Sequence, residues 1–554
     1  MKHTRFDKLI HMSTLCLSGM VTLCVSHGQA LAADLTLPSL FSDHMVLQQD
    51  VTAPVWGWAN PGDTIRVSVG GTSATAKTNP DGRWMVRLDK LPTTTTPVTL
   101  TIASTTKTIT INDVLVGDVW LCSGQSNMAM TMNQGNETNE ALPKANYPSI
   151  RYFAPRAPKR WILEPVTEID GRWVVCTPET AARFSAVGYF FISELAQHVR
   201  RPLGLICSSW SGTTAQEWTS LKALTADPAL KTKYADPLLD KIANADKVRA
   251  AHAEWLANGG AAFKEAMRKY DNETHDAKVR GEKIPPPPTY PTSEPFKFED
   301  RSHVTSLFNT MIYPLMPYAI TGVLWYQGES NNGDELYHKL FSAMIRDWRQ
   351  HWGQGDFPFL FVQLPNYTAR STRPADAGGI TIVREQQVMA LSVTPRTGMA
   401  VSVDCGDPGN IHPAFKSAIG RRLSLLARRM VYGEDILASG PTYVSQRVDG
   451  NKISLKFSNV GTGLKLGVPP KGSATPLPST TEVKGFAIAG ANKKFFWATA
   501  TLAGSDTVIV NSDQVSEPTM VRYAWENNPE VNLYNSADLP PSPFRTDMPT
   551  PTAP

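Results

Sequence analysis

The stretch from about residue 113 to 435 alternates short apolar runs with longer helical patterns. Five runs are short and rich in strand-forming residues: 114–122, 203–208, 322–326, 359–364 and 399–403. The helical patterns cover 186–199, 337–352 and 413–431. This alternation predicts a mainly parallel sheet wrapped by helices, an α/β fold. Sites in such sheets lie at the carboxyl ends of the strands, so polar residues just after these runs are candidates for function.

The regions on either side of this α/β part have a different pattern of apolar, polar and turn residues. Residues 33–112 and 440–538 contain short alternating runs separated by turn residues such as Asn60-Pro61-Gly62-Asp63. Both regions are therefore predicted to be β-rich and sandwich-like. The division we predict is an N-terminal β-rich domain (33–112), a central domain (113–435) and a C-terminal β-rich region (440–538).

Three further segments interrupt or flank these domains. A charged helical insertion is predicted at about 220–300, and it ends in the proline run 285–288. Residues 539–554 are rich in Pro and Thr and are predicted to be a disordered tail. Residues 1–32 combine a basic start, an apolar stretch and Ala30-Leu31-Ala32, the pattern of a cleaved secretory signal. A membrane anchor needs about 20 uninterrupted apolar residues, and serines and threonines interrupt this stretch. We expect an exported protein, periplasmic or extracellular.

Composition excludes several classes of function. The net charge is +4 over 554 residues, and no dense stripe of Lys and Arg suggests a nucleic-acid partner. No later segment is apolar enough to suggest a membrane partner. The sequence lacks His-Glu-x-x-His and paired Cys-x-x-Cys motifs, so we expect no catalytic metal and no cofactor. Four cysteines lie beyond the signal, and either buried thiols or one disulfide fits them: Cys122, Cys176, Cys207 and Cys405. The oligomeric state is not indicated.

Two residues at predicted strand ends suggest acyl transfer. Ser126 lies in Gly124-Gln125-Ser126-Asn127-Met128, directly after the first apolar run, where nucleophilic serines of α/β enzymes are exposed. His412 follows the last run, and a serine nucleophile with a histidine base is what acyl transfer requires. Taken alone, Ser126 also fits a turn or helix cap, and His412 before Pro413 also fits a packing residue. Met128 replaces the second glycine of a Gly-x-Ser-x-Gly elbow, which argues against the α/β-hydrolase subtype.

The block around Ser126 resembles the nucleophile block of SGNH-type carbohydrate esterases, and of the sialate O-acetylesterase family in particular. Further segments are similar to that family in order and spacing: 40–48, 184–191, 210–213, 307–312, 324–331, 411–413 and 420–423. The resemblance covers about residues 35 to 435. It implies an SGNH-hydrolase-like three-layer α/β/α domain with accessory β-sandwich-like regions. It also implies a serine-dependent carbohydrate O-acetylesterase working through an acetyl-serine intermediate, acting on O-acetylated sialic acid or on acetylated hemicellulose such as xyloglucan or xylan.

The resemblance assigns the catalytic roles. Ser126 would attack the acetyl carbonyl, and His412 would accept its proton. SGNH enzymes usually place an orienting Asp three residues before the His, where this chain has Gly409. We predict Asp407 as the orienting acid, with Asp404 as the alternative and Glu329 as a third candidate.

The remaining site residues are predicted from the same blocks. The oxyanion would be held by the backbone N–H groups of Ser126 and Gly212 and by the side-chain amide of Gln327, with Asn331 as another possible donor. Trp210, Trp325 and Glu329 are predicted to contact the sugar. Tryptophans beside strand ends are often core residues, and Glu329 could instead be a structural carboxylate beneath the site.

Two other interpretations remain. The missing Asp at position 409 keeps open a non-catalytic glycan-binding protein on a decayed hydrolase scaffold. A general lipase has little support, because the chain has no Gly-x-Ser-x-Gly and no long apolar lid.

Overall fold

The computed structural model describes residues 34–156, 163–280, 282–289, 294–297, 303–374, 378–479 and 482–547. The predicted signal segment 1–32 and residues 548–554 lie outside this range. No helix within these ranges has the length and apolar character that crossing a membrane requires.

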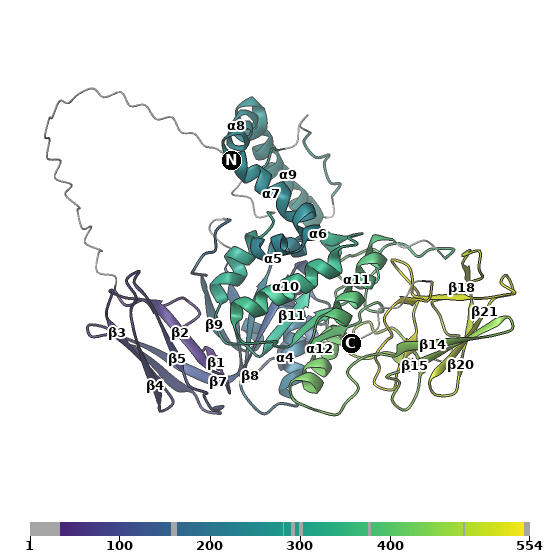
Figure 1. Cartoon of the computed structure of the whole chain (residues 1–554), viewed down its shortest axis with the longest axis horizontal. Helices are drawn as coiled ribbons and strands as arrows, with labels where there is room; N and C mark the ends of the chain where they lie inside the picture. The colour runs from purple at the N-terminus through teal and green to yellow at the C-terminus, as the bar shows by residue number, and fades with distance from the viewer. Residues whose placement is uncertain are drawn as a thin grey trace, which may run out of the picture.

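A mainly parallel sheet forms the centre of the molecule, as the alternating pattern predicted (Figure 1). Its strand order is β13-β12-β11-β7-β10-β8-β9. Every neighbouring pair is parallel except β8 and β9. The strands are β7 (Thr108–Gly124), β8 (Tyr147–Pro155), β9 (Gly171–Cys176), β10 (Leu203–Ser209), β11 (Gly322–Tyr326), β12 (Phe359–Val362) and β13 (Thr397–Ala400).

Helices cover both faces of this sheet. Helices α4 (Ala186–Ala196) and α12 (Ser417–Met430) pack on one face, and α10 (Tyr337–Trp352) and α11 (Gly379–Val393) pack on the other. Successive side chains of a strand point to opposite faces. Trp120 of β7 accordingly belongs to the core under α4 and α12, whereas Leu121 belongs to the core under α10. The predicted three-layer α/β/α domain is confirmed.

The N-terminal β unit is joined to the central sheet by a shared strand. Strands β2 (Ala53–Trp58) and β5 (Arg83–Leu88) form one small sheet. The opposing layer contains β3 (Thr64–Val69), β4 (Thr72–Lys77), β6 (Val98–Ala103) and the first half of β7. β1 (Val46–Gln48) pairs in parallel with residues 115–117 of β7. The predicted boundary at 112/113 therefore falls inside one continuous strand, and β1 belongs to the central sheet.

The helical insertion projects away from the body of the molecule (Figure 1). It contains α7 (Asp236–Ala243), α8 (Ala245–Trp255) and α9 (Ala261–Arg280). The short helices between the sheet strands are α1 (Ser126–Ala129), α2 (Thr138–Ala141), α3 (Pro178–Ala181), α5 (Leu221–Ala226) and α6 (Pro228–Leu230).

The C-terminal β unit lies beyond the β13 edge of the sheet (Figure 1). One of its sheets has the order β14-β15-β21-β20, and another has the order β19-β18-β22-β24. Its strands are β14 (Thr442–Asp449), β15 (Lys452–Ser458), β16 (Lys465–Val468), β17 (Leu477–Pro478), β18 (Phe486–Ala489), β19 (Phe496–Trp497), β20 (Thr499–Ala503), β21 (Thr507–Asn511), β22 (Met520–Tyr523), β23 (Leu533–Tyr534) and β24 (Phe544–Arg545).

The prediction of a disordered tail is wrong for residues 539–547. Leu539 is buried, and β24 pairs with β22. The ring of Phe544 stacks on Tyr443 at 4.8 Å between centroids. A proline-rich composition predicts a lack of regular structure, but these two apolar side chains give the segment enough surface to pack on the C-terminal unit.

Candidate active site

The end of β7 forms a tight turn that places Ser126 at the carboxyl edge of the sheet. Gly124 has a φ of +133°, and a Cβ there would lie 2.2 Å from the carbonyl oxygen of Tyr326, so only glycine fits. The N–H of Gln125 donates to the same carbonyl at 3.0 Å. Ser126 is the first residue of α1, and the first N–H groups of a helix have no intrahelical partner. Its N–H is therefore available to a bound oxyanion.

His412 reaches Ser126 from the segment between β13 and α12. Its Nε2 lies 2.6 Å from Ser126 Oγ, although 286 positions separate the two residues. The side-chain oxygen of Gln125 is a second acceptor for the same hydroxyl. Burial lowers the pKa of His412, and the nearby Lys416 lowers it further. The imidazole is thus neutral at pH 7 and able to take the serine proton.

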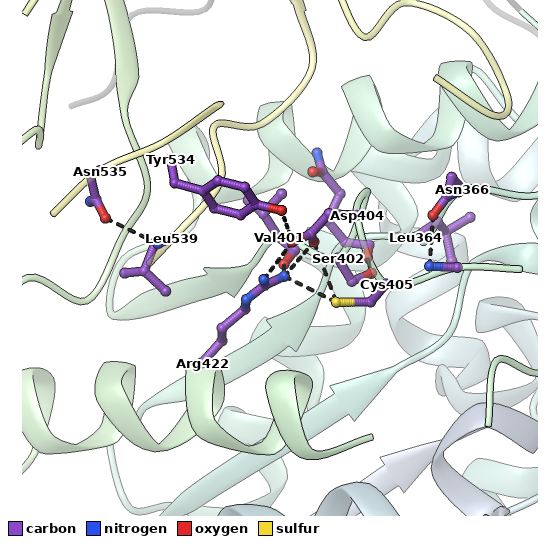
Figure 2. A network of polar contacts seen from close by, with 12 residues as sticks. Leu364, Asn366, Val401, Ser402, Asp404, Cys405, Arg422, Tyr534, Asn535 and Leu539 are labelled. Atoms are coloured by element: carbon purple, nitrogen blue, oxygen red, sulfur yellow. Dashed lines mark hydrogen bonds and ion pairs between the residues drawn. The ribbon is translucent and has the colours of Figure 1, made fainter. Parts of the chain in front are cut away.

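The structure does not place Asp404 beside His412. Its carboxylate is fully buried and makes two hydrogen bonds to Arg422 of α12, at 2.6 and 2.7 Å. Tyr534 of the C-terminal unit donates a third at 3.0 Å, so Arg422 and Tyr534 hold Asp404 from two sides (Figure 2). Burial alone would raise the pKa of Asp404, but Arg422 lowers it below its usual value. Asp404 is an anchor of the fold, and the alternative assignment as orienting acid is corrected.

Asp407 lies on the exposed part of the same segment. Its Oδ1 accepts the N–H of Gly409 at 2.8 Å, a local turn bond. Among the described residues, no carboxylate hydrogen-bonds the Nδ1 of His412. The backbone N–H of His412 instead donates to Asn410 Oδ1 at 2.9 Å. The triad role of Asp407 stays a prediction that these contacts do not support.

A polar network beneath Ser126 connects three segments of the site. Asn127 Nδ2 donates to Glu329 at 2.6 Å and to the carbonyl of Ile411 at 3.0 Å. Lys416 Nζ donates to Asn127 Oδ1 at 2.7 Å and is completely buried. Burial lowers the pKa of Lys416 to about 7 and raises that of Glu329. Glu329 therefore supports the nucleophile turn and the histidine segment from below, in place of the predicted sugar contact.

The predicted oxyanion donor Gln327 is also corrected. Its two amide hydrogens donate to the carbonyl of Thr213 at 3.1 Å and to Asn331 Oδ1 at 2.8 Å. The side chain is fully buried, so no donor remains for a substrate. Asn331 is engaged as well, because its Nδ2 donates to Gln216 at 3.0 Å. Both amides tie the segment after β10 to the segment after β11.

Gly212 and Trp210 lie next to the nucleophile turn. The N–H of Trp210 donates to the carbonyl of Gly124 at 2.9 Å, which brings the segment after β10 to Ser126. Gly212 follows in an exposed turn with φ +73° and nothing within 4 Å of its Cβ position. Its N–H as a second oxyanion donor, and Trp210 as a sugar contact, remain predictions.

Trp325 is a core residue rather than a sugar contact. It is fully buried under α10, and its ring lies 5.9 Å from Trp218 and 5.8 Å from Trp348 between centroids. The prediction is wrong because Trp325 points to the face of the sheet that α10 covers, where aromatic side chains enclose it. The four cysteines beyond residue 32 are buried free thiols. Within the described ranges, no group of three or more His, Cys, Asp and Glu side chains could hold a metal ion.

Three residues of the site were not predicted from the sequence: Gln125, Asn127 and Lys416. The first two flank Ser126 in the motif itself, but only the serine was assigned a role. Lys416 follows Pro413-Ala414-Phe415, and a lysine directly after apolar residues beside a candidate base was the available signal.

Comparisons with known proteins identify the family. Residues 299–424 match the family model for carbohydrate esterases described as sialic acid-specific acetylesterases. The sialate O-acetylesterase of Mus musculus is 31% identical over 466 residues, which cover 76% of this chain and 79% of the mouse protein. That of Rattus norvegicus is 33% identical over 440 residues, which cover 73% of this chain and 75% of the rat protein.

A solved structure is similar over nearly the whole chain. The crystal structure of a carbohydrate acetylesterase from Xanthomonas citri superposes with a TM-score of 0.73 and 34% sequence identity. The match covers 93% of this chain and all of that one. From these likenesses and the serine turn at the sheet edge, we conclude that the chain belongs to the sialate O-acetylesterase family and is a carboxylic ester hydrolase of the carbohydrate acetylesterase kind.

Proposed function

We propose that this protein is exported and removes O-acetyl groups from sugars through an acetyl-serine intermediate on Ser126. The observation that carries the proposal is the 2.6 Å contact between Ser126 Oγ and His412 Nε2. Export rests on the predicted signal at residues 1–32. The substrate is O-acetylated sialic acid or an acetylated hemicellulose such as xyloglucan or xylan.

The first half-reaction transfers the acetyl group to the enzyme. Ser126 Oγ bonds to the acetyl carbonyl carbon while His412 Nε2 takes the serine proton. The carbonyl oxygen becomes an oxyanion facing the N–H of Ser126, and that of Gly212 is the second proposed donor. One such donor is commonly worth about 3 kcal/mol in the transition state. The bond to the sugar oxygen then breaks, and His412 returns the proton to it.

The second half-reaction releases acetate. A water takes the place of the sugar hydroxyl and gives a proton to His412 as its oxygen bonds to the acetyl carbon. The bond to Ser126 Oγ breaks, and His412 protonates the serine. The lowered pKa of His412 favours the neutral imidazole at the start of each half-reaction. Asn410 Oδ1 accepts the backbone N–H of His412 and Asn127 Nδ2 donates to the carbonyl of Ile411, so these bonds fix the backbone that carries His412.

Acetate release from O-acetylated sialic acid and from acetylated xylo-oligosaccharides tests this proposal. Ser126→Ala is expected to abolish release from both. The matched control is Ser123→Ala near the end of β7, three residues before Ser126, whose buried hydroxyl has no hydrogen-bond partner among the described residues. It is expected to retain activity. Mass spectrometry of quenched wild-type enzyme should find an acetyl group on Ser126. Full activity in Ser126→Ala would overturn the serine mechanism.

A further inference from the structure

A groove separates the central domain from the C-terminal β unit. Its larger hollow has a volume of about 970 Å³ and is lined by Gly406 and Pro408 on one side and by Val468 and Lys484 on the other. A second hollow of about 380 Å³ extends to Trp497. The two adjoin, because both are lined by Arg370, Glu482, Lys484 and Glu530, and together they are called the groove here.

The groove begins at the edge of the sheet that carries Ser126 and His412. Gly406 and Pro408 belong to the segment that leaves the carboxyl end of β13 and continues to His412. Asn366 and Arg370 line the same hollow from the segment that leaves β12. Ligands of open α/β sheets bind at this edge. The groove therefore leads from the histidine segment towards the C-terminal unit.

The C-terminal unit is a firmly attached wall of this groove. Arg384 of α11 donates to the carbonyl of Glu526 at 2.8 Å and to that of Asn527 at 3.0 Å. Glu385 of the same helix binds Arg545 at 2.8 Å, and Tyr534 binds Asp404. Figure 2 shows the ring of Tyr534 directed toward Asp404 and Arg422. Buried contacts on several strands hold the two walls in a fixed relation.

Four charged residues of the groove form two ion pairs. Arg370 lies 3.2 Å from Glu530, and Lys484 lies 3.4 Å from Glu482. These four side chains offer hydrogen-bond donors and acceptors with little net charge. At the floor of the second hollow, Glu526 is 7% exposed and its Oε2 has no hydrogen-bond partner among the described residues. Such a lining fits a hydroxyl-rich neutral ligand better than an anion.

An aromatic platform lies at the far end. Trp497 is 40% exposed, unusual for a large apolar side chain in this protein. Its indole N–H donates to the carbonyl of Thr372 at 3.3 Å, so the ring is fixed against the central domain. An exposed, immobilised aromatic face with a polar tip is suited to stacking on a sugar ring.

We propose that this groove binds the neutral main chain of an acetylated polysaccharide, with Trp497 stacking on a sugar distant from the acetyl group under attack. This inference rests on the proposed function and selects a neutral polymer over a single acidic sugar as substrate. The hollows have the size of established ligand clefts, which commonly occur at domain interfaces.

Kinetics on substrates of different length test the groove. Trp497→Ala is expected to raise KM for acetylated xylan about tenfold, from the loss of one stacking contact, and to leave 4-nitrophenyl acetate hydrolysis unchanged. The matched control is Val448→Ala, an exposed apolar residue of the same unit on β14 that does not line the groove. An unchanged KM for xylan in Trp497→Ala would overturn the proposal.

Binding without turnover separates the groove from catalysis. Full-length Ser126→Ala protein is run by affinity electrophoresis in gels containing deacetylated xylan, xyloglucan or a polyuronate. A neutral polymer should retard it, and the added Trp497→Ala change should abolish the retardation. Retardation by the polyuronate alone, or retardation independent of Trp497, would overturn the neutral-chain assignment. Neither outcome tests the serine mechanism. That mechanism is tested by 4-nitrophenyl acetate hydrolysis in the Ser126→Ala variant.

Discussion

Two stretches of the segment between β13 and α12 differ sharply in their surroundings. Residues 401–405 are all buried, and Asp404 there is held by Arg422 and Tyr534. Residues 407–410 are exposed and lead to half-buried His412, which contacts Ser126. One stretch joins the central sheet to the C-terminal unit, while the next positions the base. Two aspartates three positions apart therefore serve different purposes, and substitutions in the two stretches should affect different properties.

The largest effect is expected at the outer end of this segment. His412→Ala should lower kcat/KM for an acetylated sugar about 10⁴-fold, because it removes the general base. The free energy of unfolding should change by less than about 1 kcal/mol, because the side chain is only half buried. The control is His252→Ala on α8 of the insertion, which should leave kcat/KM unchanged. Activity above a tenth of wild type in His412→Ala would contradict the assigned base.

A substitution at Asp404 in the buried stretch, residues 401–405, should lower the stability of the fold. Asp404→Asn leaves Arg422 buried without its counter-charge, and the free energy of unfolding at pH 7 should fall by about 3–5 kcal/mol. Urea titration measures this loss in the free energy of unfolding. The value of kcat/KM is measured separately on the folded fraction. A control that replaces both partners, Asp404→Leu with Arg422→Met, should recover much of the loss.

The pH dependence of that stability has a definite sign. Arg422 lowers the pKa of Asp404 in the folded state, so its contribution is complete above the unfolded value of about 3.9. It is lost as the pH falls through the lower folded pKa. The gap between wild type and Asp404→Asn should thus be constant near neutrality and narrow in acid. A gap that widens below pH 4 would contradict the pairing.

Sequence alone predicted the parts of this segment that depend on local pattern. The apolar run and the strand end follow from the local residue pattern, as do β11 and α10 with their observed bounds, whereas the role of His412 came from the family resemblance. The two partners of Asp404 could not be predicted from local pattern. Arg422 is one of several arginines in α12, and Tyr534 lies 130 positions away in the sequence. Gln327 and Trp325 were misassigned for the same reason: the direction of a side chain at a strand end depends on what packs beside it.

An intermediate effect is expected from substitution of Lys416. This residue lies beneath the site, and in the sequence it stands after the two stretches and directly before α12. Its charge disfavours the protonated imidazole and so lowers the pKa of His412. Lys416→Met should raise that pKa, so the acid limb of the kcat/KM profile should move to higher pH. Lys452→Met, at an exposed position on β15 of the C-terminal unit and outside the groove, is the matched control. A limb that stays in place or moves to lower pH would contradict the proposed coupling.

The smallest effect is expected at Asp407, and it decides how His412 is oriented. Within the described ranges its carboxylate accepts one hydrogen bond, from the nearby N–H of Gly409, which an asparagine side chain also accepts. Asp407→Asn should therefore change kcat/KM less than about threefold, whereas loss of an orienting triad acid costs about 10⁴-fold. A loss above about 100-fold would restore Asp407 as the acid. It would mean that residues 407–410 rearrange when substrate binds, because among the described residues Asn410 and Asn127 bond the backbone around His412 and Ser126 bonds its ring.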